Sequence, residues 1–173
     1  YLTINVSEFF RDPDRFAFLR DRVLPRLLAN SRRLTIWSAG CSNGAEPYSV
    51  AILLEELSPR QAHSILATDI DERILGIAQA GNSYRESDVK NVPTSLRGRY
   101  FLQRGDRLAI TDSLKRHLVF KKHNLLADKF EDGFDLILCR NVVIYFSNEA
   151  KARLFVNLSR ALRPGGVLFV GAT

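Results

Sequence analysis

Methionine is absent from the 173 residues, cysteine is scarce, and no apolar run is long. The longest apolar runs fall well short of the roughly 20 residues that a membrane-spanning helix needs. No charged stretch followed by an apolar one stands at the N-terminus, so we expect neither export nor membrane insertion and place the protein in the cytoplasm. Because the sequence lacks methionine and begins at Tyr1, we expect it to be a piece of a longer product.

The few cysteines and histidines do not form a metal-binding pattern. Cys41 and Cys139 are far apart, no CxxC pair occurs, and His63, His117 and His123 are scattered. We therefore expect no metal site, and we expect reduced thiols, as is usual in the cytoplasm.

The composition predicts one globular domain, with 46% hydrophobic residues and a chain long enough for a proper core. The net charge of +6 is unevenly placed: segment 85–122 holds ten Lys and Arg against four Asp and Glu, while the remainder is balanced at 15 each. Such a segment attracts nucleic acid, an acidic protein face or anionic lipid. A merely solvated basic surface is an equally good interpretation.

The stretch 34–57, LTIWSAGCSNGAEPYSVAILLEEL, predicts a strand, a glycine turn and a helix whose apolar residues recur at helical spacing from Val50 to Leu57. Glycines let a backbone approach a ligand, and the free N–H groups at a helix start can face it. Gly40 and Gly44 are separated by three residues, which is not the strict dinucleotide-binding fingerprint. A plain turn between strand and helix therefore fits this motif as well.

Strands and helices alternate along the rest of the chain. Buried strands are predicted at 64–68, 118–120, 134–139 and 167–170, and a helix at Glu72–Ala80. A second helix, Glu149–Leu162, is predicted to turn these residues inward: Ala152, Phe155, Leu158, Ala161 and Leu162. The alternation predicts an α/β fold with a doubly wound, mostly parallel, Rossmann-like sheet.

Two segments depart from this alternation. At the start, Ser7 stands where a helix N-cap would, Phe9 and Phe10 follow as a hydrophobic plug, and a helix runs on from Asp14 until Pro25 bends it. Segment 84–117 contains a proline-marked loop, an aromatic pair and a Gly-Asp turn, and this pattern predicts a small antiparallel β insertion.

Polar residues follow several predicted strands at their carboxyl ends, where parallel sheets bind ligands. They are Ser38, Glu46, Asp69, Asn124, Arg140 and Asn141. Of Asp69 and Asp71, one is expected to bind a ribose and the other to cap the following helix; Asp69 is nearer the strand and is the better candidate for binding. Glu46, in the first turn of a helix, could equally serve the helix dipole, and Arg140 could form an ordinary surface ion pair.

Six strings together resemble the CheR chemotaxis-receptor methyltransferases. They are NVSEFFRD (5–12), AGCSNGAEPYSVA (39–51), ATDID (67–71), NLL (124–126), FDLILCRNVVIYF (134–146) and LRPGGVLFVG (162–171). The resemblance implies a class I fold that uses S-adenosylmethionine to esterify glutamates on chemoreceptors and releases S-adenosylhomocysteine. It also implies a leading segment (1–33) that covers the cofactor, and a methyltransferase domain (34–173) whose insertion at about 84–117 helps to dock the receptor.

The resemblance carries over to individual residues. Asn5, Ser7 and Arg11 match residues that close over the cofactor, with Ser7 standing where the family usually has Thr. Glu46 faces the methionine end, Asp69 binds ribose, and Asn124 and Leu125 read adenine. Arg140 and Asn141 lie near the methyl-donating sulfur. Tyr145 is a weak candidate for orienting the substrate carboxylate, and packing under the next helix is an equally good role for it.

The chain departs from the family at both ends. The family has a helical domain before the FFR segment and continues after position 173 with a Ser–Glu pair, a helix and two closing strands. We therefore expect either a naturally short protein or a fragment. If the strands are absent, a sheet edge is exposed.

Three other functions remain as alternatives. A non-catalytic module that binds S-adenosylmethionine is favoured by the shortened ends, and a nucleic-acid methyltransferase by the pI near 9.6. The latter usually has an Asn/Asp-Pro-Pro-aromatic motif after the fourth strand, where this chain has Asn141-Val142-Val143, so we expect no nucleic-acid partner. An NAD-linked dehydrogenase shares only the fold, and fold does not imply function.

Overall fold

The computed structural model describes residues 7–140, 142 and 146–171. Within these residues, five strands form one parallel sheet in the order β5-β2-β1-β6-β7, and two form a separate antiparallel pair. The strands are β1 (Thr35–Ala39), β2 (Ser64–Asp69), β3 (Phe101–Arg104), β4 (Arg107–Ile110), β5 (Leu118–Lys122), β6 (Phe134–Cys139) and β7 (Leu162–Val170). The predicted doubly wound α/β fold with a small antiparallel insertion is confirmed.

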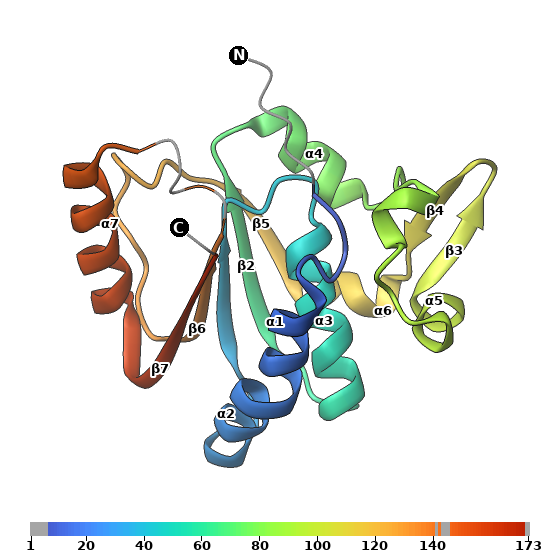
Figure 1. The fold of residues 1–173 in the computed structure, drawn as a ribbon, viewed down its shortest axis with the longest axis horizontal. Coiled ribbons are helices and arrows are strands. Elements are labelled where there is room, and N and C mark those ends of the chain that lie inside the picture. Colours follow the sequence, from blue (N-terminus) through green and yellow to red (C-terminus); the bar gives the residue numbers. More distant parts are fainter. Residues whose placement is uncertain (1–6, 141, 143–145, 172–173) are drawn as a thin grey trace.

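Helices cover both faces of the sheet. They are α1 (Pro13–Phe18), α2 (Leu24–Asn30), α3 (Ala45–Leu57), α4 (Glu72–Ala80), α5 (Thr94–Tyr100), α6 (Asp112–Lys115) and α7 (Asn148–Ala161), with a π-helix at Leu19–Val23 and a 3₁₀-helix at Glu86–Val89. Figure 1 shows α7 on one side of the sheet and α1 to α3 on the other, while the β3–β4 pair projects away from α7. Across this described part of the chain, no helix has both the length and the apolar character to cross a membrane.

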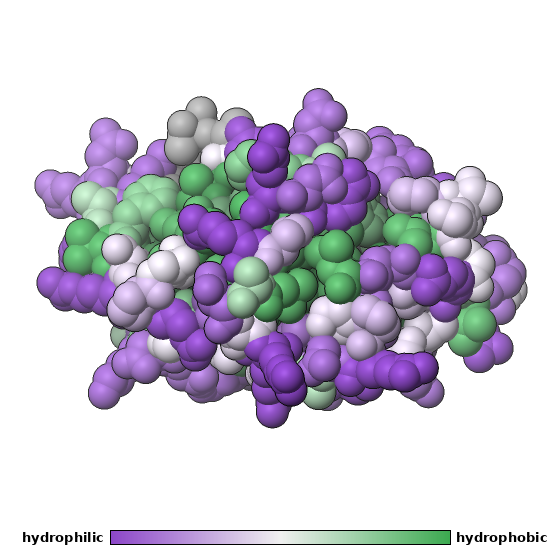
Figure 2. Space-filling model, turned by 90° about the horizontal axis from the view of Figure 1, so that it is seen from below, coloured by the Kyte–Doolittle hydropathy of each residue, from purple (hydrophilic) through white to green (hydrophobic). Residues whose placement is uncertain are grey.

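Alternation along the central strands builds two cores. Ile36 and Leu138 face α1 to α3 and belong to the larger cluster, whereas Trp37 and Ile137 face α7 with Leu154. All six residues of β6 are buried, as expected for a central parallel strand. Figure 2 views the face at the amino ends of the strands, where apolar surface extends from the α7 side to the middle and hydrophilic side chains surround it.

The N-terminal segment differs from the sequence prediction. Phe9 and Phe10 are buried as a plug, but no helix follows Ser7, and α1 begins only at Pro13. The reason is local: Phe10 and Asp12 both have left-handed φ angles, 52° and 56°, which are incompatible with a helix.

The helix predicted from Asp14 is interrupted just before Pro25. Leu24 N–H bonds to Leu19 O, five residues earlier, so the helix widens into a π turn before α2 begins. Because proline has no N–H to donate to the preceding turn, a distortion at this place is expected.

The insertion contains more helix than predicted. The β3–β4 pair is present, but a 3₁₀-helix and α5 precede it, and Pro93 is the residue before α5. Glu56 of α3 accepts a hydrogen bond from Tyr100 Oη at 2.5 Å and is 2.9 Å from Arg99. These contacts fix the insertion to the C-terminal end of α3.

Two predictions about the C-terminal region are corrected. In α7 the buried stripe is Ala150, Leu154, Leu158 and Ala161, and Phe155 is half-buried, but Ala152 is exposed. Strand β7 begins at Leu162, which pairs with Phe134, rather than at Val167. Residues 163–166 form an irregularity in the ladder, so the Pro-Gly-Gly run lies inside the strand's span.

Candidate functional site

A cavity of about 450 Å³ lies at the carboxyl ends of β1, β2, β5 and β6. Binding sites for small molecules and cofactors typically measure about 300–1,000 Å³. Most of the residues that the sequence predicted to bind the cofactor line it: Ser7, Arg11, Glu46, Asp69, Asn124, Leu125 and Arg140. The structure thus brings together side chains from both halves of the chain. Asn5, Asn141 and Tyr145 lie outside the described residues.

The floor of the cavity is the glycine turn after β1. Gly40 and Gly44 have φ angles of 73° and 89°, and Cys41 N–H bonds to Thr68 O at 2.8 Å. A Cβ on Gly40 would stand 2.1 Å from Val142 Cγ2, so a side chain cannot be added there without displacement. Cys41 also lines the cavity, and burial raises the pKa of its thiol well above the usual range.

The sequence left open which of Asp69 and Asp71 caps the following helix and which faces the ligand. Asp71 caps α4, since its Oδ1 accepts the N–H groups of Arg73 at 2.9 Å and Ile74 at 3.3 Å. Asp69 lines the cavity; its Oδ2 accepts Ser42 N–H at 2.9 Å and its Oδ1 accepts Asp71 N–H at 3.1 Å. A carboxylate offers about four acceptor positions, so Asp69 keeps capacity for ligand hydroxyl groups.

The loop after β5 forms the end of the cavity nearest Asp69. Asn124 Oδ1 accepts Leu126 N–H at 3.0 Å, and Asn124 N–H donates to Asp128 at 2.8 Å. Leu125 N–H has no acceptor within the described chain. Ile70 and Leu126 line the mouth and are 59% and 55% exposed, which is unusual for side chains of this size.

Sequence reasoning missed several residues of this end. Ile70, His123, Leu126 and Phe146 also line the cavity. The first two adjoin predicted ligands at strand ends, so extending each strand-end prediction by one residue would have found them. Phe146 has no comparable signal, because it enters from the segment before α7.

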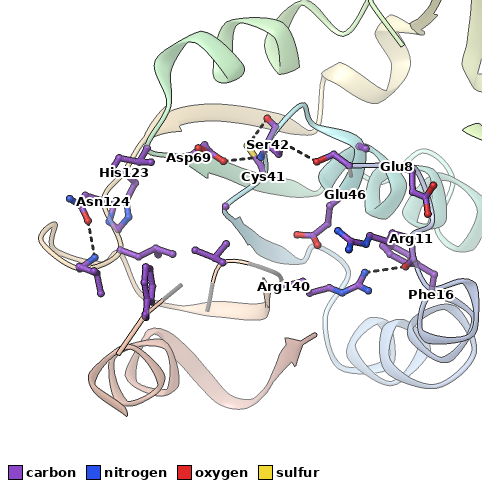
Figure 3. A pocket seen from close by; sticks show the side chains of 18 residues that line it. Glu8, Arg11, Phe16, Cys41, Ser42, Glu46, Asp69, His123, Asn124 and Arg140 are labelled. Carbon is purple, nitrogen blue, oxygen red and sulfur yellow. Dashed lines mark hydrogen bonds between the residues drawn. The ribbon is translucent and has the colours of Figure 1, made fainter. Parts of the chain in front are cut away.

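The opposite end is charged, and its residues are buried or partly buried. Glu46 Oε1 accepts a hydrogen bond from Ser38 Oγ at 2.8 Å. Burial raises the pKa of Glu46, while the Ser38 hydroxyl and the positive charges of Arg140 and Arg11 act against this rise. Figure 3 shows Glu46, Arg11 and Arg140 grouped at one end and Asp69, His123 and Asn124 at the other.

Arg140 forms an ion pair, as considered from the sequence, but at 3% exposure its guanidinium is buried, so this is not an ordinary surface pair. Its Nη1 donates to Arg11 O at 3.2 Å, its Nη2 pairs with the Asp12 carboxylate, and the Phe16 ring centroid lies 5.5 Å from its guanidinium carbon. Nε is buried with no partner in the described chain. Burial lowers the Arg140 pKa, and this side chain fastens the N-terminal segment to the end of β6.

The N-terminal segment closes one wall of the cavity. Ser7 Oγ donates to Ser42 Oγ at 2.9 Å, and Asn43 Nδ2 donates to Ser7 O at 3.4 Å. Phe10 N–H donates to Ser49 Oγ at 3.0 Å. Ser7 therefore joins the glycine turn rather than capping a helix.

Comparison with known proteins assigns the chain to a family. The model of the CheR methyltransferase, SAM binding domain, matches residues 5–173. The chain belongs to the CheR methyltransferase family. Its cofactor is accordingly S-adenosylmethionine, and the resemblance predicted from the six sequence strings is confirmed.

Curated relatives agree with the CheR assignment. The chemotaxis protein methyltransferase of Listeria monocytogenes is 43% identical over 173 residues, which cover 99% of this chain and 66% of the relative. A probable chemotaxis protein methyltransferase of Rhizobium etli is 41% identical, with 99% of this chain and 68% of the relative covered. The chain thus spans about two thirds of the length of these relatives.

Solved structures show the same fold at low sequence identity. PKMT2 from Rickettsia typhi in complex with AdoHcy superposes with a TM-score of 0.56 at 16% identity, covering 95% of this chain and 26% of that one. A putative O-methyltransferase from Nostoc punctiforme gives a TM-score of 0.55 at 14% identity, covering 94% and 37%. These likenesses establish the class I methyltransferase fold of this CheR domain.

Proposed function

We propose that this CheR domain transfers the methyl group of S-adenosylmethionine to glutamate side chains on the cytoplasmic part of chemoreceptors, and that it works in the cytoplasm. The observation that carries the proposal is one cavity that has an acidic, loop-lined end at Asp69 and a charged end at Glu46, Arg11 and Arg140. Such a cavity suits a ligand with a sugar at one place and charged amino-acid groups at another.

The residues present fit S-adenosylmethionine by their chemistry. Asp69 would accept the ribose hydroxyls, and the free N–H of Leu125 and the amide of Asn124 would bind the adenine edge. Glu46 would face the positively charged amino group, while Arg11 and Arg140 would balance the carboxylate. Ser7 would close over the ligand from the N-terminal segment, together with Asn5, and Asn141 would lie near the sulfur.

When bound, the cofactor supplies an electrophilic methyl group on a positively charged sulfur. The chain's own part is to position the acceptor. A glutamate carboxylate has a reference pKa of about 4.3 and is already ionised at pH 7, so no general base is required. Arg11 and Arg140 lie beside Glu46 at this end of the cavity, where their positive charges would help to orient a carboxylate. Tyr145 remains a candidate for orienting that carboxylate.

The N-terminal segment would also exclude water from the reacting groups. Phe9 is fully buried and Ser7 is bonded to the glycine turn, so the segment lies as a fixed wall. In-line placement of an acceptor in such a site can supply several kcal/mol of catalysis, on the order of 7–11 kcal/mol at best.

The basic insertion would dock the receptor. Its positive charge suits a target that bears several glutamates, since complementary charge raises the rate of encounter. No nucleic-acid partner is proposed, because the stacking motif of amino-methylating enzymes is absent after β6.

A labelled methyl-transfer assay to receptor cytoplasmic fragments, paired with calorimetry of S-adenosylmethionine and S-adenosylhomocysteine, tests the proposal. We expect both ligands to bind and base-labile label to appear on the fragment. Binding without transfer would favour a non-catalytic module derived from this family. Transfer to nucleic acid in preference to receptor, with binding that falls steeply with salt, would favour the nucleic-acid alternative.

A further inference from the structure

A second cavity, of about 380 Å³, adjoins the first. Ser7 and Glu8 line both cavities, and they form the partition between them. The remaining walls of the second cavity come from Asn43 of the glycine turn and from the start of the insertion, residues 83–90. In Figure 3, Glu8 lies on the side of the first cavity that holds Glu46 and Arg11, where an acceptor carboxylate would react.

The acidic groups of the second cavity already have partners. Glu8 is 3.1 Å from Lys90 Nζ and accepts a hydrogen bond from Asn91 at 3.4 Å. Asp88 Oδ2 accepts the backbone N–H of Arg85 at 2.8 Å. Glu8 thus has a cationic partner, and Asp88 is held by the backbone N–H of Arg85.

The Arg85 guanidinium has no such partner. Arg85 is exposed at the cavity wall and forms no salt bridge with any carboxylate of the described chain. Ser83 and Ser87, on the same wall, add hydroxyl groups that are exposed to the cavity. The second cavity thus presents the Arg85 guanidinium with two hydroxyl groups on the same wall, beside the Glu8–Lys90 pair and the Asp88 carboxylate.

This wall is held in place from several directions. Tyr84 Oη donates to Asn43 O at 2.7 Å, and Phe9 N–H donates to Asp88 O at 2.9 Å. Tyr84 also pairs with Leu108 of β4, and its ring packs edge-to-face on Phe9 with 4.8 Å between centroids. The backbone that carries Arg85 is therefore preorganised, which lowers the entropy cost of binding.

We propose that the Arg85 cavity binds a second acidic side chain of the methyl-accepting protein, one that lies beside the glutamate being esterified. This inference rests on the function proposed above. An acceptor chain that crosses the partition of Ser7 and Glu8 would place one carboxylate in each cavity. A guanidinium binds a carboxylate through two parallel hydrogen bonds, so the site selects Glu or Asp over the corresponding amides.

Steady-state methyl transfer with Arg85→Gln, Arg85→Lys and the control Arg73→Gln tests this. Arg73 is an exposed arginine on α4 outside both cavities. The acceptors are a receptor fragment and a matched fragment in which carboxylates near each esterified glutamate are replaced by amides. On the acidic fragment, Arg85→Gln should raise KM about tenfold, and Arg85→Lys by less, while S-adenosylhomocysteine affinity and Tm stay unchanged. On the amide fragment, the wild type and Arg85→Gln should be equal.

Two results would overturn the inference. In the first, Arg85→Gln has the same KM as Arg73→Gln on the acidic fragment. In the second, Arg85→Gln raises KM by the same factor on both fragments. If the wild type methylates neither fragment, the proposed function fails instead. In that case, equilibrium binding of the two fragments in the presence of S-adenosylhomocysteine still tests whether the Arg85 cavity binds a carboxylate. Preference of the wild type, but not of Arg85→Gln, for the acidic fragment would support it, and no preference would refute it.

Discussion

At the residue scale, Asp69 and Asp71 are two acidic side chains of one strand end with different partners. Asp71 satisfies backbone N–H groups of α4, and Asp69 lines the cavity. The sequence could predict that one of them caps and the other faces a ligand. The assignment of Asp71 to the cap is confirmed, while the binding role of Asp69 stays a prediction.

Asp69→Ala should weaken binding of S-adenosylhomocysteine by about 1–3 kcal/mol, because ribose hydroxyls would lose a charged acceptor. Calorimetry measures this directly. Asp71→Ala is the matched control: it should lower the free energy of unfolding by about 1 kcal/mol through loss of the cap and leave cofactor affinity nearly unchanged. The reverse pattern would move the ribose site to Asp71.

Gly40→Ala should destabilise the protein more than Gly105→Ala does. Both glycines have positive φ angles, 73° and 61°, so both substitutions share the backbone penalty. Only at Gly40 would the new Cβ meet another atom, Val142 Cγ2, whereas nothing lies within 4 Å at Gly105. The difference in unfolding free energy by urea titration should be about 1–3 kcal/mol. Equal losses of unfolding free energy in the two variants would mean that the Val142 side chain can move away from the new Cβ at little cost.

At the scale of elements, boundaries that local residues set were predicted well. Boundaries that depend on pairing with a distant strand were not. Helix α4 has its predicted bounds because Asp71 caps it and Gly81, in the left-handed region, ends it. Strand β7 starts earlier than predicted because Leu162 pairs with Phe134 of β6, a contact that no nearby residue signals.

Two buried histidines join the starts of three strands. His63 Nδ1 accepts Leu34 N–H at 3.1 Å, and His117 Nδ1 accepts His63 N–H at 3.2 Å. The other nitrogen of His117 is therefore the donor to Glu55, 2.6 Å away. Burial and the neighbouring His117 lower the pKa of His63. Protonation at His63 Nδ1 would remove the hydrogen bond from Leu34 N–H.

Stability should accordingly fall as pH drops below about 6.5, the pKa of an unfolded histidine. Below that value the unfolded chain binds a proton that folded His63 resists, so the loss approaches about 1.4 kcal/mol per pH unit for this group. Urea titrations between about pH 7.5 and 5.5 measure it. His63→Asn keeps an acceptor for Leu34 N–H but cannot titrate, so it should flatten the slope. A slope equal to the wild type would assign the effect to other groups.

At the scale of the whole molecule, the sequence predicted where the site lies better than how it is enclosed. Parallel strands end on one side of a sheet, so the convergence of Glu46, Asp69 and Asn124 follows from topology. The burial of Arg140 against Asp12 and the second cavity at Arg85 depend on how the N-terminal segment and the insertion pack together. No periodicity or spacing encodes that packing.

The uneven charge predicts a salt-dependent interaction with receptor. Raising ionic strength from about 0.05 M to about 0.5 M should raise KM for a receptor fragment several-fold, because screening weakens attraction between exposed charges. Cofactor affinity should change less, since Arg140, which would face the carboxylate of the cofactor, is buried and is screened less by salt. Reversing Arg104 and Arg107 to Glu, on the exposed β3–β4 turn, should imitate high salt. Salt-independent KM would locate docking elsewhere.

The central strand of the sheet has a consequence for synthesis on the ribosome. Thr35 N–H donates to Asp135 Oδ2 at 2.8 Å across a sequence separation of 100 residues, and β1 lies between β2 and β6. A nascent chain that has not yet delivered β6 also lacks Arg140, which fastens the N-terminal segment. At about 5–20 residues per second, the ribosome needs roughly 5–20 s to synthesise the 100 residues between Thr35 and Asp135, and β1 has no β6 to pair with during that time. Competence to hold the cofactor is therefore acquired only after β6 has been synthesised, when residues 100 or more positions apart have met.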